Sequence, residues 1–348
     1  MSENNILVFI ENNNGNVNVN VNVLQVSLEL ISKATELAKT LNVKVCGVIL
    51  GFNFHLQNEM LENIAHYGLD EIYVIDDPRL KHFTSIPYAK AISALIRKLN
   101  PNIVLFGATT TGRDIAPRIA SELKCGLTAD CTDLQLGEYT IKNKTYQNTL
   151  LQIRPAFGGN IMATIVSPDS SPSMATVREG VMRLNSVDPN KKAIIVNEKL
   201  SDLNVFDSDF QTEVVEIILK EKSVDLKNAK IIVAAGMGAS SEGAITLIKD
   251  LARTLGGEVA GSRPVIDAGV LTKDHQVGQT GITVRPTLYI ACGISGQIQH
   301  RAGMEEAKRI LAINKDPNAP IFSIAHYSIV GDVMDVIPKI ISAYKNKL

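Results

Sequence analysis

The chain has 348 residues, a length that predicts two domains at roughly 150 residues each. Its net charge of −1, its 5% content of aromatic residues and its lack of tryptophan argue against a nucleic-acid surface or an anionic membrane surface. No apolar run reaches the ~18 residues that a spanning helix needs, and no basic segment followed by an apolar stretch opens the chain. We therefore expect a cytoplasmic protein without a membrane span.

The first part of the chain alternates apolar, strand-like runs with amphipathic segments of helix length. The expected strands are 6–10, 43–50, 71–75 and 103–106, and the expected helices are about 27–41, 57–67, 87–99 and 113–123. Apolar strands separated by helices predict a parallel sheet covered on both faces. Between 128 and 178 the pattern changes, and 145–153 and 160–166 are expected to be strands joined by short turns. This predicts a β-rich extension of the first domain.

Two polar segments interrupt these patterns. In 12–22 Asn comes to alternate with Val, which is typical of either an edge hairpin or a surface loop, and we expect a loop or hairpin tip without function. The stretch 185–212 is polar and irregular, so we expect the linker there. We divide the chain into a scaffold and partner-packing domain, 1–203, and a second domain, 204–348.

The second domain begins a new α/β pattern near Lys230. Its expected strands are 231–235, 288–292, 309–313 and 321–324, and its expected helices are about 240–255 and 330–344. The predicted fold class is therefore α/β: an N-terminal parallel-sheet α/β domain with a β-rich extension, then a C-terminal Rossmann-like α/β domain. The four cysteines form no C-x-x-C pair, so we expect no metal site.

A glycine turn follows the first strand of the second domain. Gly236, Gly238 and Gly243 lie between strand and helix, as in a phosphate-binding turn, although any strand–helix junction can need such glycines. Glu258 follows Gly238 by 20 residues, which is the spacing of a ribose-binding acid. An NAD-dependent oxidoreductase is therefore one hypothesis, although no catalytic acid/base pair is evident.

A denser group of glycines, hydroxyls and cations follows at 261–263, 276–281 and 293–300. Backbone N–H groups free to approach closely, hydroxyl donors and an arginine are what a pyrophosphate needs. Ser295 is expected near a helix start, where the helix dipole favours an anion. His300 is expected in the same open turn and not in a packed core. Together these motifs predict a ligand site.

The same motifs resemble the α subunit of electron transfer flavoproteins. They read Gly-Ser-Arg at 261–263, Gln-Val-Gly-Gln-Thr-Gly at 276–281, Leu-Tyr-Ile-Ala-Cys-Gly-Ile-Ser-Gly-Gln-Ile-Gln-His at 288–300 and Ala-Ile-Asn-Lys-Asp-Pro at 312–317. The order and spacing hold from Gly236 to about Pro338. Upstream, Gly-Ala-Thr-Thr-Thr-Gly-Arg-Asp at 107–114 and Arg-Pro-Ala-Phe-Gly-Gly-Asn at 154–160 extend the resemblance to most of the chain.

The resemblance implies FAD as the cofactor and assigns residues to it. Arg263 would lie over the isoalloxazine ring, Thr280 near its N5 and His300 near its O2. The full set of implied cofactor-binding residues is Ser262, Arg263, Gln276, Val277, Gly278, Gln279, Thr280, Gly281, Ser295, Gly296, Gln297, Ile298, Gln299, His300, Asn314 and Asp332. Two positions depart from the pattern: Met237 replaces a common Arg, and His326 replaces a common Asp. His326 is either a surface residue or one near the FAD.

The resemblance also implies partners. A β subunit would complete a heterodimer, and electrons would pass to or from a flavin dehydrogenase such as an acyl-CoA dehydrogenase. In a narrower hypothesis, NADH reduces a second FAD in the β subunit, which divides its electrons between ferredoxin or flavodoxin and this chain. The first domain serves as a scaffold, or else 109–114 forms the loop of an adenine-nucleotide-binding regulatory module. Arg113 and Asp114 there are as well explained by a helix-start ion pair.

Overall fold

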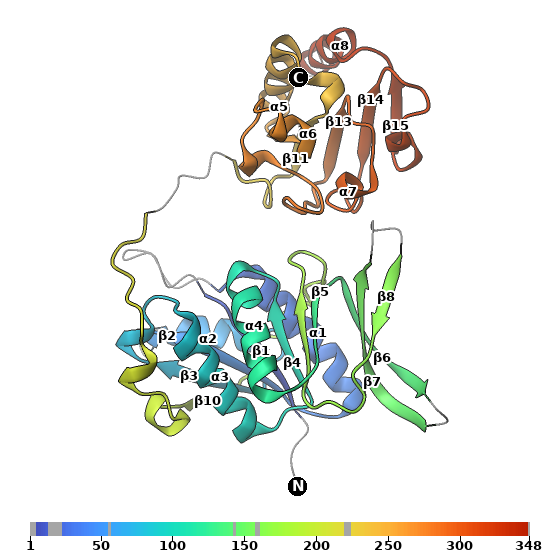
Figure 1. The fold of residues 1–348 in the computed structure, drawn as a ribbon. Helices are drawn as coiled ribbons and strands as arrows, with labels where there is room; N and C mark the ends of the chain where they lie inside the picture. Colours follow the sequence, from blue (N-terminus) through green and yellow to red (C-terminus); the bar gives the residue numbers. More distant parts are fainter. Residues whose placement is uncertain are drawn as a thin grey trace. The chain divides into compact units, whose positions relative to one another are not determined.

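The computed structural model describes residues 5–12, 23–54, 57–141, 144–156, 161–218 and 224–346. The chain forms two compact units (Figure 1). The N-terminal unit contains Met1–Ala156 and Met162–Ile218, and the main part of the C-terminal unit is Leu219–Leu348. Among the helices of the described residues, none is both long and apolar enough to cross a membrane. Most of the Asn-rich segment, 13–22, lies outside the described residues, but Asn12 and Val23 on either side of it form an antiparallel bridge.

The N-terminal unit is built on a seven-stranded parallel sheet in the order β10-β3-β2-β1-β4-β9-β5. Its strands are β1 (Ile6–Phe9), β2 (Val45–Gly51), β3 (Glu71–Asp76), β4 (Ile103–Gly107), β5 (Leu127–Cys131), β9 (Ser173–Val177) and β10 (Ile194–Asn197). Its helices are α1 (Gln25–Leu41), α2 (Asn58–Ala65), α3 (Ser85–Leu99) and α4 (Thr110–Leu123).

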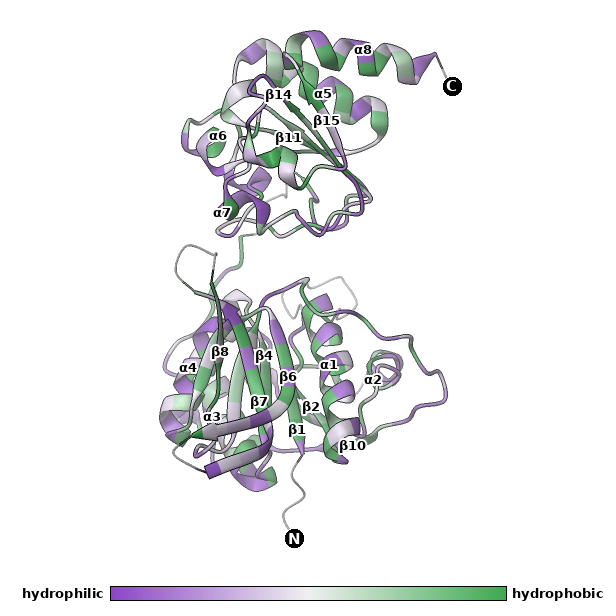
Figure 2. Ribbon diagram, turned by 90° about the vertical axis from the view of Figure 1, so that its right-hand side faces the viewer, coloured by the Kyte–Doolittle hydropathy of each residue, from purple (hydrophilic) through white to green (hydrophobic). Residues whose placement is uncertain are grey.

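Alternate side chains of each central strand enter two different cores. Ile6 and Val8 of β1 pack with α1 and α2, whereas Leu7 and Phe9 pack with α3 and α4. Both faces of the sheet are therefore covered, and its strands are mainly hydrophobic while the helices mix both colours in Figure 2. The predicted parallel-sheet α/β domain is confirmed.

A separate three-stranded antiparallel sheet extends this unit. It consists of β6 (Asp133–Ile141), β7 (Lys144–Pro155) and β8 (Met162–Ile165). Leu134 and Leu150 anchor it to the core on the α1 side of the main sheet. The predicted β-rich extension is thus present, although β6 was not expected as a strand.

The expected linker at 185–212 is wrong for much of its length, because this segment completes the N-terminal unit. β10 pairs with β3 at the edge of the sheet, with Ile194 opposite Glu71. Its side chains are largely exposed, so the strand has no clear alternation of apolar and polar residues. Leu200 and Leu203 of the following 3₁₀ helix are buried against α3 and its neighbours. The domain division at 203/204 stays a prediction.

The C-terminal unit has a five-stranded parallel sheet in the order β12-β11-β13-β14-β15. Its strands are β11 (Ile231–Ala235), β12 (Glu258–Gly261), β13 (Leu288–Cys292), β14 (Ile310–Asn314) and β15 (Tyr327–Val330). The helices α5 (Glu242–Leu255) and α8 (Val333–Lys345) pack on one face. Loops and the 3₁₀ helix Pro320–Ser323 cover the other face through residues such as Val277, Met304 and Ile321. The short helix α6 (Arg263–Asp267) directly follows β12, and the short helix α7 (Ile298–Arg301) follows the turn after β13.

One predicted strand of this unit is wrong. The apolar residues 321–324 fall mainly in a 3₁₀ helix, Pro320–Ser323, and the edge strand β15 comes after it. Pro320 favours the helix because proline fits a first helical position and cannot donate to a sheet. Ile321 is fully buried, so its hydrophobicity reflects packing of the helix into the core.

Candidate functional site

The predicted binding motifs meet at the carboxyl edge of the five-stranded sheet. Gly236 follows β11, Ser262 follows β12, Gly293 follows β13 and Asp332 follows β15, while Asn314 ends β14. The strand order reverses between β11 and β13, since β12 lies on one side of β11 and β13 on the other. Open parallel sheets bind their ligands at the carboxyl edge beside such a reversal. The topology therefore indicates the place that the motifs predicted.

Two glycine turns touch at this reversal. The N–H of Gly236 donates to the Cys292 carbonyl at 2.8 Å, and that of Gly238 donates to the Gly293 carbonyl at 3.1 Å. A Cβ on Gly236 would stand 2.2 Å from the Gly293 oxygen. Gly293 itself has a φ of +63°. These glycines are thus required for close approach of two backbones, whatever they bind.

The loop 276–281 joins the other motifs to each other. The Val277 N–H donates to the Gly261 carbonyl at 3.0 Å, and the Gln279 N–H donates to the Gln299 carbonyl at 2.7 Å. Gly278 has a φ of +142°, and a Cβ there would stand 2.9 Å from the Gln299 oxygen. The segments 261–263, 276–281 and 299–300 therefore form one connected backbone structure.

Several predicted residues of this structure have side-chain partners or remain exposed. Gln276 is buried, and its amide nitrogen donates to the Thr280 hydroxyl at 2.9 Å. Arg263 begins α6, and its guanidinium pairs with Asp267 at 3.3 Å with both side chains about two-thirds exposed. Ser262 is buried directly before it. Arg263 and Thr280 thus present a cation and a hydroxyl to solvent at the site edge.

The turn after β13 differs from the expectation in one respect. Ser295 is exposed, and its carbonyl accepts from the Ile321 N–H at 2.9 Å. Gly296 has a φ of +87°, and a Cβ there would stand 2.3 Å from the Ile321 nitrogen. α7 begins only at Ile298, after Gln297, and is a single turn. The helix start is therefore near Ser295 as expected, but a single turn contributes little dipole, and the role of Ser295 in binding an anion stays a prediction.

His300 is buried, which contradicts the expected open turn. Its side chain is 7% exposed, and its Nε2 lies 3.0 Å from the hydroxyl of the fully buried Tyr289. Its Nδ1 is buried and has no hydrogen-bond partner among the described residues. Burial lowers the pKa of His300 to about 4, so the ring is neutral at pH 7. Tyr289 was not singled out in the sequence.

The last two predicted residues have structural roles at strand ends. The Asn314 amide nitrogen donates to the Ile294 carbonyl at 2.9 Å, and its oxygen accepts from the Asp316 N–H at 3.0 Å. Asp332 caps α8 by accepting from the Met334 N–H at 2.9 Å. Lys315 lies 2.8 Å from the other Asp332 oxygen and lowers the pKa of that carboxyl.

The alternative site for NAD does not fit this arrangement. Glu258 is the first residue of β12 and pairs with Ile232 near the start of β11. It therefore lies at the amino end of the sheet, whereas the ligand edge is the carboxyl end. His326 likewise precedes β15, where its Nδ1 accepts from the Ile310 N–H at 3.1 Å. Both residues belong to the edge opposite the candidate site.

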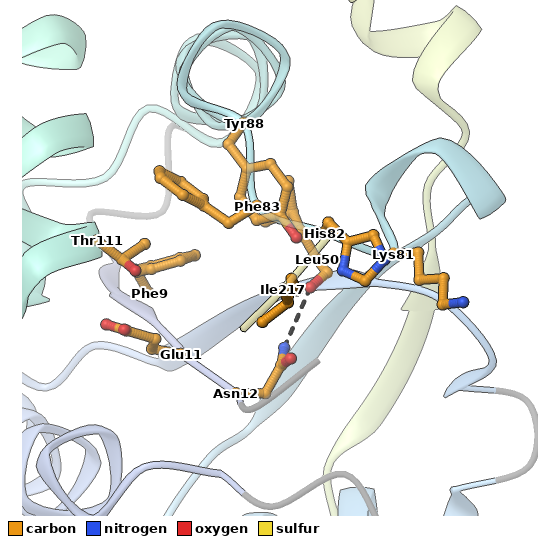
Figure 3. Close-up of a pocket in the computed structure, with 10 residues that line it drawn as sticks. All are labelled: Phe9, Glu11, Asn12, Leu50, Lys81, His82, Phe83, Tyr88, Thr111 and Ile217. Atoms are coloured by element: carbon orange, nitrogen blue, oxygen red, sulfur yellow. Dashed lines mark hydrogen bonds between the residues drawn. The ribbon is translucent and has the colours of Figure 1, made fainter. Parts of the chain in front are cut away.

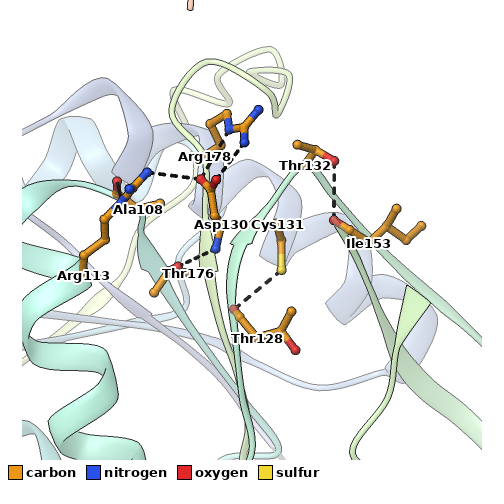
Figure 4. Close-up of polar contacts among 9 residues, drawn as sticks. All are labelled: Ala108, Arg113, Thr128, Asp130, Cys131, Thr132, Ile153, Thr176 and Arg178. Carbon is orange, nitrogen blue, oxygen red and sulfur yellow. Dashed lines mark hydrogen bonds and ion pairs between the residues drawn. The ribbon is translucent and has the colours of Figure 1, made fainter. Parts of the chain in front are cut away.

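In the N-terminal unit, Arg113 and Asp114 have separate partners and do not pair with each other. Arg113 of α4 donates to the Ala108 carbonyl and to Asp130, which also pairs with Arg178 at 2.7 Å (Figure 4). Burial alone would raise the pKa of Asp130, but Arg178 and the neighbouring arginines more than offset this and lower it. Asp114 instead accepts from Ser85 and Arg118. These contacts join α4 to β5 and α3 as a scaffold.

Comparison with known proteins covers both units. The family model of the electron transfer flavoprotein domain matches residues 6–203, and that of the electron transfer flavoprotein FAD-binding domain matches residues 225–305. The chain is 46% identical to an electron transfer flavoprotein subunit alpha of Thermoanaerobacterium thermosaccharolyticum over 323 residues, 92% of this chain and 94% of that protein.

Two further relatives carry more specific names. The acryloyl-CoA reductase electron transfer subunit beta of Anaerotignum propionicum is 42% identical, and the match covers 92% of each chain. The lactate dehydrogenase (NAD(+),ferredoxin) subunit LctC of Acetobacterium woodii is also 42% identical, over 91% of this chain and 72% of that protein.

Proposed function

Because this chain belongs to the alpha-subunit family of electron transfer flavoproteins, we propose that its FAD lies along the carboxyl edge of the C-terminal sheet. The observation that carries the proposal is the convergence of five strand ends and the loop 276–281 on that edge. The residues proposed to hold the cofactor are Ser262, Arg263, Gln276, Val277, Gly278, Gln279, Thr280, Gly281, Ser295, Gly296, Gln297, Ile298, Gln299, His300, Asn314 and Asp332.

The groups at this edge suit a flavin dinucleotide. Exposed Thr280 and Ser295 offer hydroxyls, while the glycines at 278, 281 and 296 let neighbouring backbone segments pack closely around them. The buried Nδ1 of His300 needs a polar partner, because an unpaired buried polar atom costs stability. When bound, FAD supplies the reversible uptake and release of electrons.

His300 and Arg263 would tune the site in different ways. In the tautomer of the neutral His300 ring whose Nε2 accepts from the Tyr289 hydroxyl, the proton is on Nδ1, which would then donate a hydrogen bond toward the cofactor. Arg263 supplies positive charge, which favours electron uptake by a neighbouring ring. Asp267 offsets part of that charge through its ion pair.

The partners follow from the family and from the names of the relatives. The family pairs with a β subunit, and we infer a heterodimer that exchanges electrons with a flavin dehydrogenase, such as an acyl-CoA dehydrogenase, in the cytoplasm. The name of the LctC relative includes both NAD(+) and ferredoxin, which supports the narrower hypothesis of electron bifurcation from NADH with ferredoxin or flavodoxin. The acryloyl-CoA reductase relative supports an acyl-CoA partner.

Co-expression with the β subunit tests the cofactor and the assembly. The purified heterodimer should contain FAD, and the chain expressed alone should lose it or aggregate. A colourless heterodimer that binds NADH would contradict the proposal, and a stable flavinylated monomer would contradict the need for a partner.

Paired substitutions test the position of Arg263. Arg263→Ala should lower the flavin midpoint potential by on the order of tens of millivolts, because it removes a nearby positive charge. Asp267→Asn should shift the potential in the opposite direction, since it releases the same charge from its ion pair. Unchanged potentials in both variants, with full FAD content, would show that Arg263 lies away from the ring.

A further inference from the structure

Buried polar atoms without hydrogen-bond partners occur in both units. In the N-terminal unit, two of them belong to Asn12 and His82, which line a pocket of about 260 Å³ beside Glu11 (Figure 3). The amide nitrogen of Asn12 donates to the Leu50 carbonyl at 3.1 Å, and its Oδ1 has no partner among the described residues. The bonded nitrogen thus determines that the acceptor end of this amide is the free one.

His300 in the C-terminal unit has the same arrangement with a ring in place of an amide. Its Nδ1 is buried without a partner in the described part of the chain, and its Nε2 lies 3.0 Å from the Tyr289 hydroxyl. Burial keeps the ring neutral at pH 7 by lowering its pKa to about 4. A neutral imidazole carries one proton, so one nitrogen donates and the other accepts. The direction of the hydrogen bond with Tyr289 therefore determines whether Nδ1 is a donor or an acceptor.

The surroundings of Tyr289 favour one direction. Its side chain is fully buried, and among the described residues His300 is the only hydrogen-bond partner of its hydroxyl. Burial raises the pKa of the phenol well above its ordinary value of 10, so the hydroxyl keeps its proton. A proton on Nε2 of His300 would leave the phenol proton buried without an acceptor, which is unfavourable. The Tyr289 hydroxyl is therefore the donor and Nε2 the acceptor.

Both residues are built on parts of the fold that are held firmly in place. Tyr289 belongs to β13, an inner strand between β11 and β14. The Gly303 N–H donates to the His300 carbonyl at 3.0 Å. A Cβ on Gly303 would stand 2.5 Å from Gly278, so the loop 276–281 packs directly on this turn. The ring of His300 thus has a fixed backbone on one side and a fixed hydroxyl on the other.

We propose that Tyr289 is a positioning residue for the flavin: its hydroxyl holds the proton of the His300 ring on Nδ1, from which His300 donates to the cofactor. This role presupposes the FAD site proposed above. Tyr289 lies in the core of the unit, so it acts through His300. With the proton on Nε2 instead, His300 would direct a lone pair toward the flavin O2, the atom that the family resemblance assigns to it.

Nitrogen-15 NMR of ring-labelled histidine tests the tautomer, because protonated and unprotonated ring nitrogens resonate in separate regions. In the heterodimer freed of FAD, the His300 signals should show a protonated Nδ1 and an unprotonated Nε2, with the assignment made from their absence in His300→Leu. Tyr289→Phe should transfer a substantial part of the population to the Nε2 tautomer. A wild-type ring protonated on Nε2 would overturn the proposal, and this result does not depend on whether FAD is the cofactor.

A double-mutant cycle on the FAD-loaded heterodimer tests the effect on the cofactor. Tyr289→Phe should raise the dissociation constant of FAD roughly two- to ten-fold. It should also shift the flavin midpoint potential in the same direction as His300→Leu. In the His300→Leu background, Tyr289→Phe should change neither quantity further, because the group through which it acts is gone.

Tyr73→Phe is the matched control in the other unit. Tyr73 is also buried, and its hydroxyl donates to Glu71 at 2.7 Å. This variant should leave the FAD dissociation constant, the flavin potential and the His300 tautomer unchanged. Equal effects of Tyr289→Phe with and without His300, or no effect on FAD affinity and potential, would show that the Tyr289 hydroxyl serves packing alone. If Tyr289→Phe folds poorly, the spectrum of the wild-type complex still decides the tautomer.

Discussion

The two units share one plan and differ in what fills the carboxyl edge of the sheet. Each has a central parallel strand, β1 or β11, at a reversal of the strand order. After β11 the chain makes a turn with Gly236 and Gly238, and its backbone touches the turn after β13. After β1 it presents Glu11 and Asn12, whose side chains contact Thr109 and Leu50 instead.

This difference shows that the position of a site and the chemistry of its ligand are determined by different parts of the fold. Topology puts a crevice at the same point of both sheets, but the loop residues choose the ligand. In the C-terminal unit glycines let two turns pack closely together, whereas in the N-terminal unit a carboxylate at the start of α4 closes that position to anions. Three predictions test how far the contrast holds.

The largest effect is expected at the paired glycine turns. Gly293→Ala places a Cβ 2.6 Å from the Gly238 backbone at a φ of +63°. We expect a loss of about 3–5 kcal/mol of stability together with loss of FAD. Gly256→Ala is the matched control, since Gly256 has a φ of +66° but nothing within 4 Å, and should cost only about 1–2 kcal/mol.

Urea unfolding and FAD content of the purified complex measure both variants. Equal stabilities would mean that the turns after β11 and β13 can separate, and the close backbone approach would then not define the C-terminal site.

Acid should affect the two units in opposite directions. His300 has a pKa of about 4 in the folded state, so its burial destabilises the C-terminal unit as pH falls below its ordinary value of 6.5. Without the cofactor, about 2 kcal/mol should be lost between pH 7 and pH 5. The pKa of Glu11 is raised in the folded state. Its contribution to the free energy of unfolding therefore grows as pH falls and is lost as pH rises through its folded-state pKa.

His300→Leu and Glu11→Gln separate these contributions in the FAD-free complex. Urea midpoints at several pH values should show that the stability of His300→Leu decreases less than that of the wild type as pH falls. The stability of Glu11→Gln should decrease more than that of the wild type. A pH profile that neither substitution alters would show that the two buried groups do not titrate with unfolding.

The smallest effect concerns a residue that departs from the family pattern. His326→Ala removes the acceptor for the N–H of the buried Ile310 and should cost about 1 kcal/mol, because the exposed position of His326 lets water replace part of the lost contact. His326→Asp keeps an acceptor and should restore the midpoint of thermal unfolding. FAD content should not change in either variant, and a lower content would place His326 in the flavin site after all.

The sequence predicted the fold where local patterns were long and regular. The strands and helices up to α4, the β-rich extension and the helices α5 and α8 all appear near their expected positions. β5, β9, β10 and β12 were not expected, because each is a strand of four or five residues with no pattern of its own. Residues 321–324 were mistaken for a strand, because burial of Ile321 and a proline-started turn produce the same apolar run.

The candidate site was predictable as a set of segments but not as a set of contacts. Glycine-rich motifs indicated 261–263, 276–281 and 293–300, and the structure brings these together. The burial of His300 could not be foreseen, since it depends on Tyr289 from a neighbouring strand. The pocket at Glu11 depends likewise on Thr109, a residue 98 positions away.

The order of strands along the chain also determines when each unit can assemble during synthesis. β9 is an inner strand between β4 and β5, yet it follows the whole excursion through β6, β7 and β8. β10, which closes the far edge on β3, emerges later still. A nascent chain that has passed β5 therefore carries β4 with an open inner edge, which invites pairing with other strands. The β6–β8 sheet is local in sequence and can form in the meantime, so slow translation between β8 and β9 would prolong exposure of that edge.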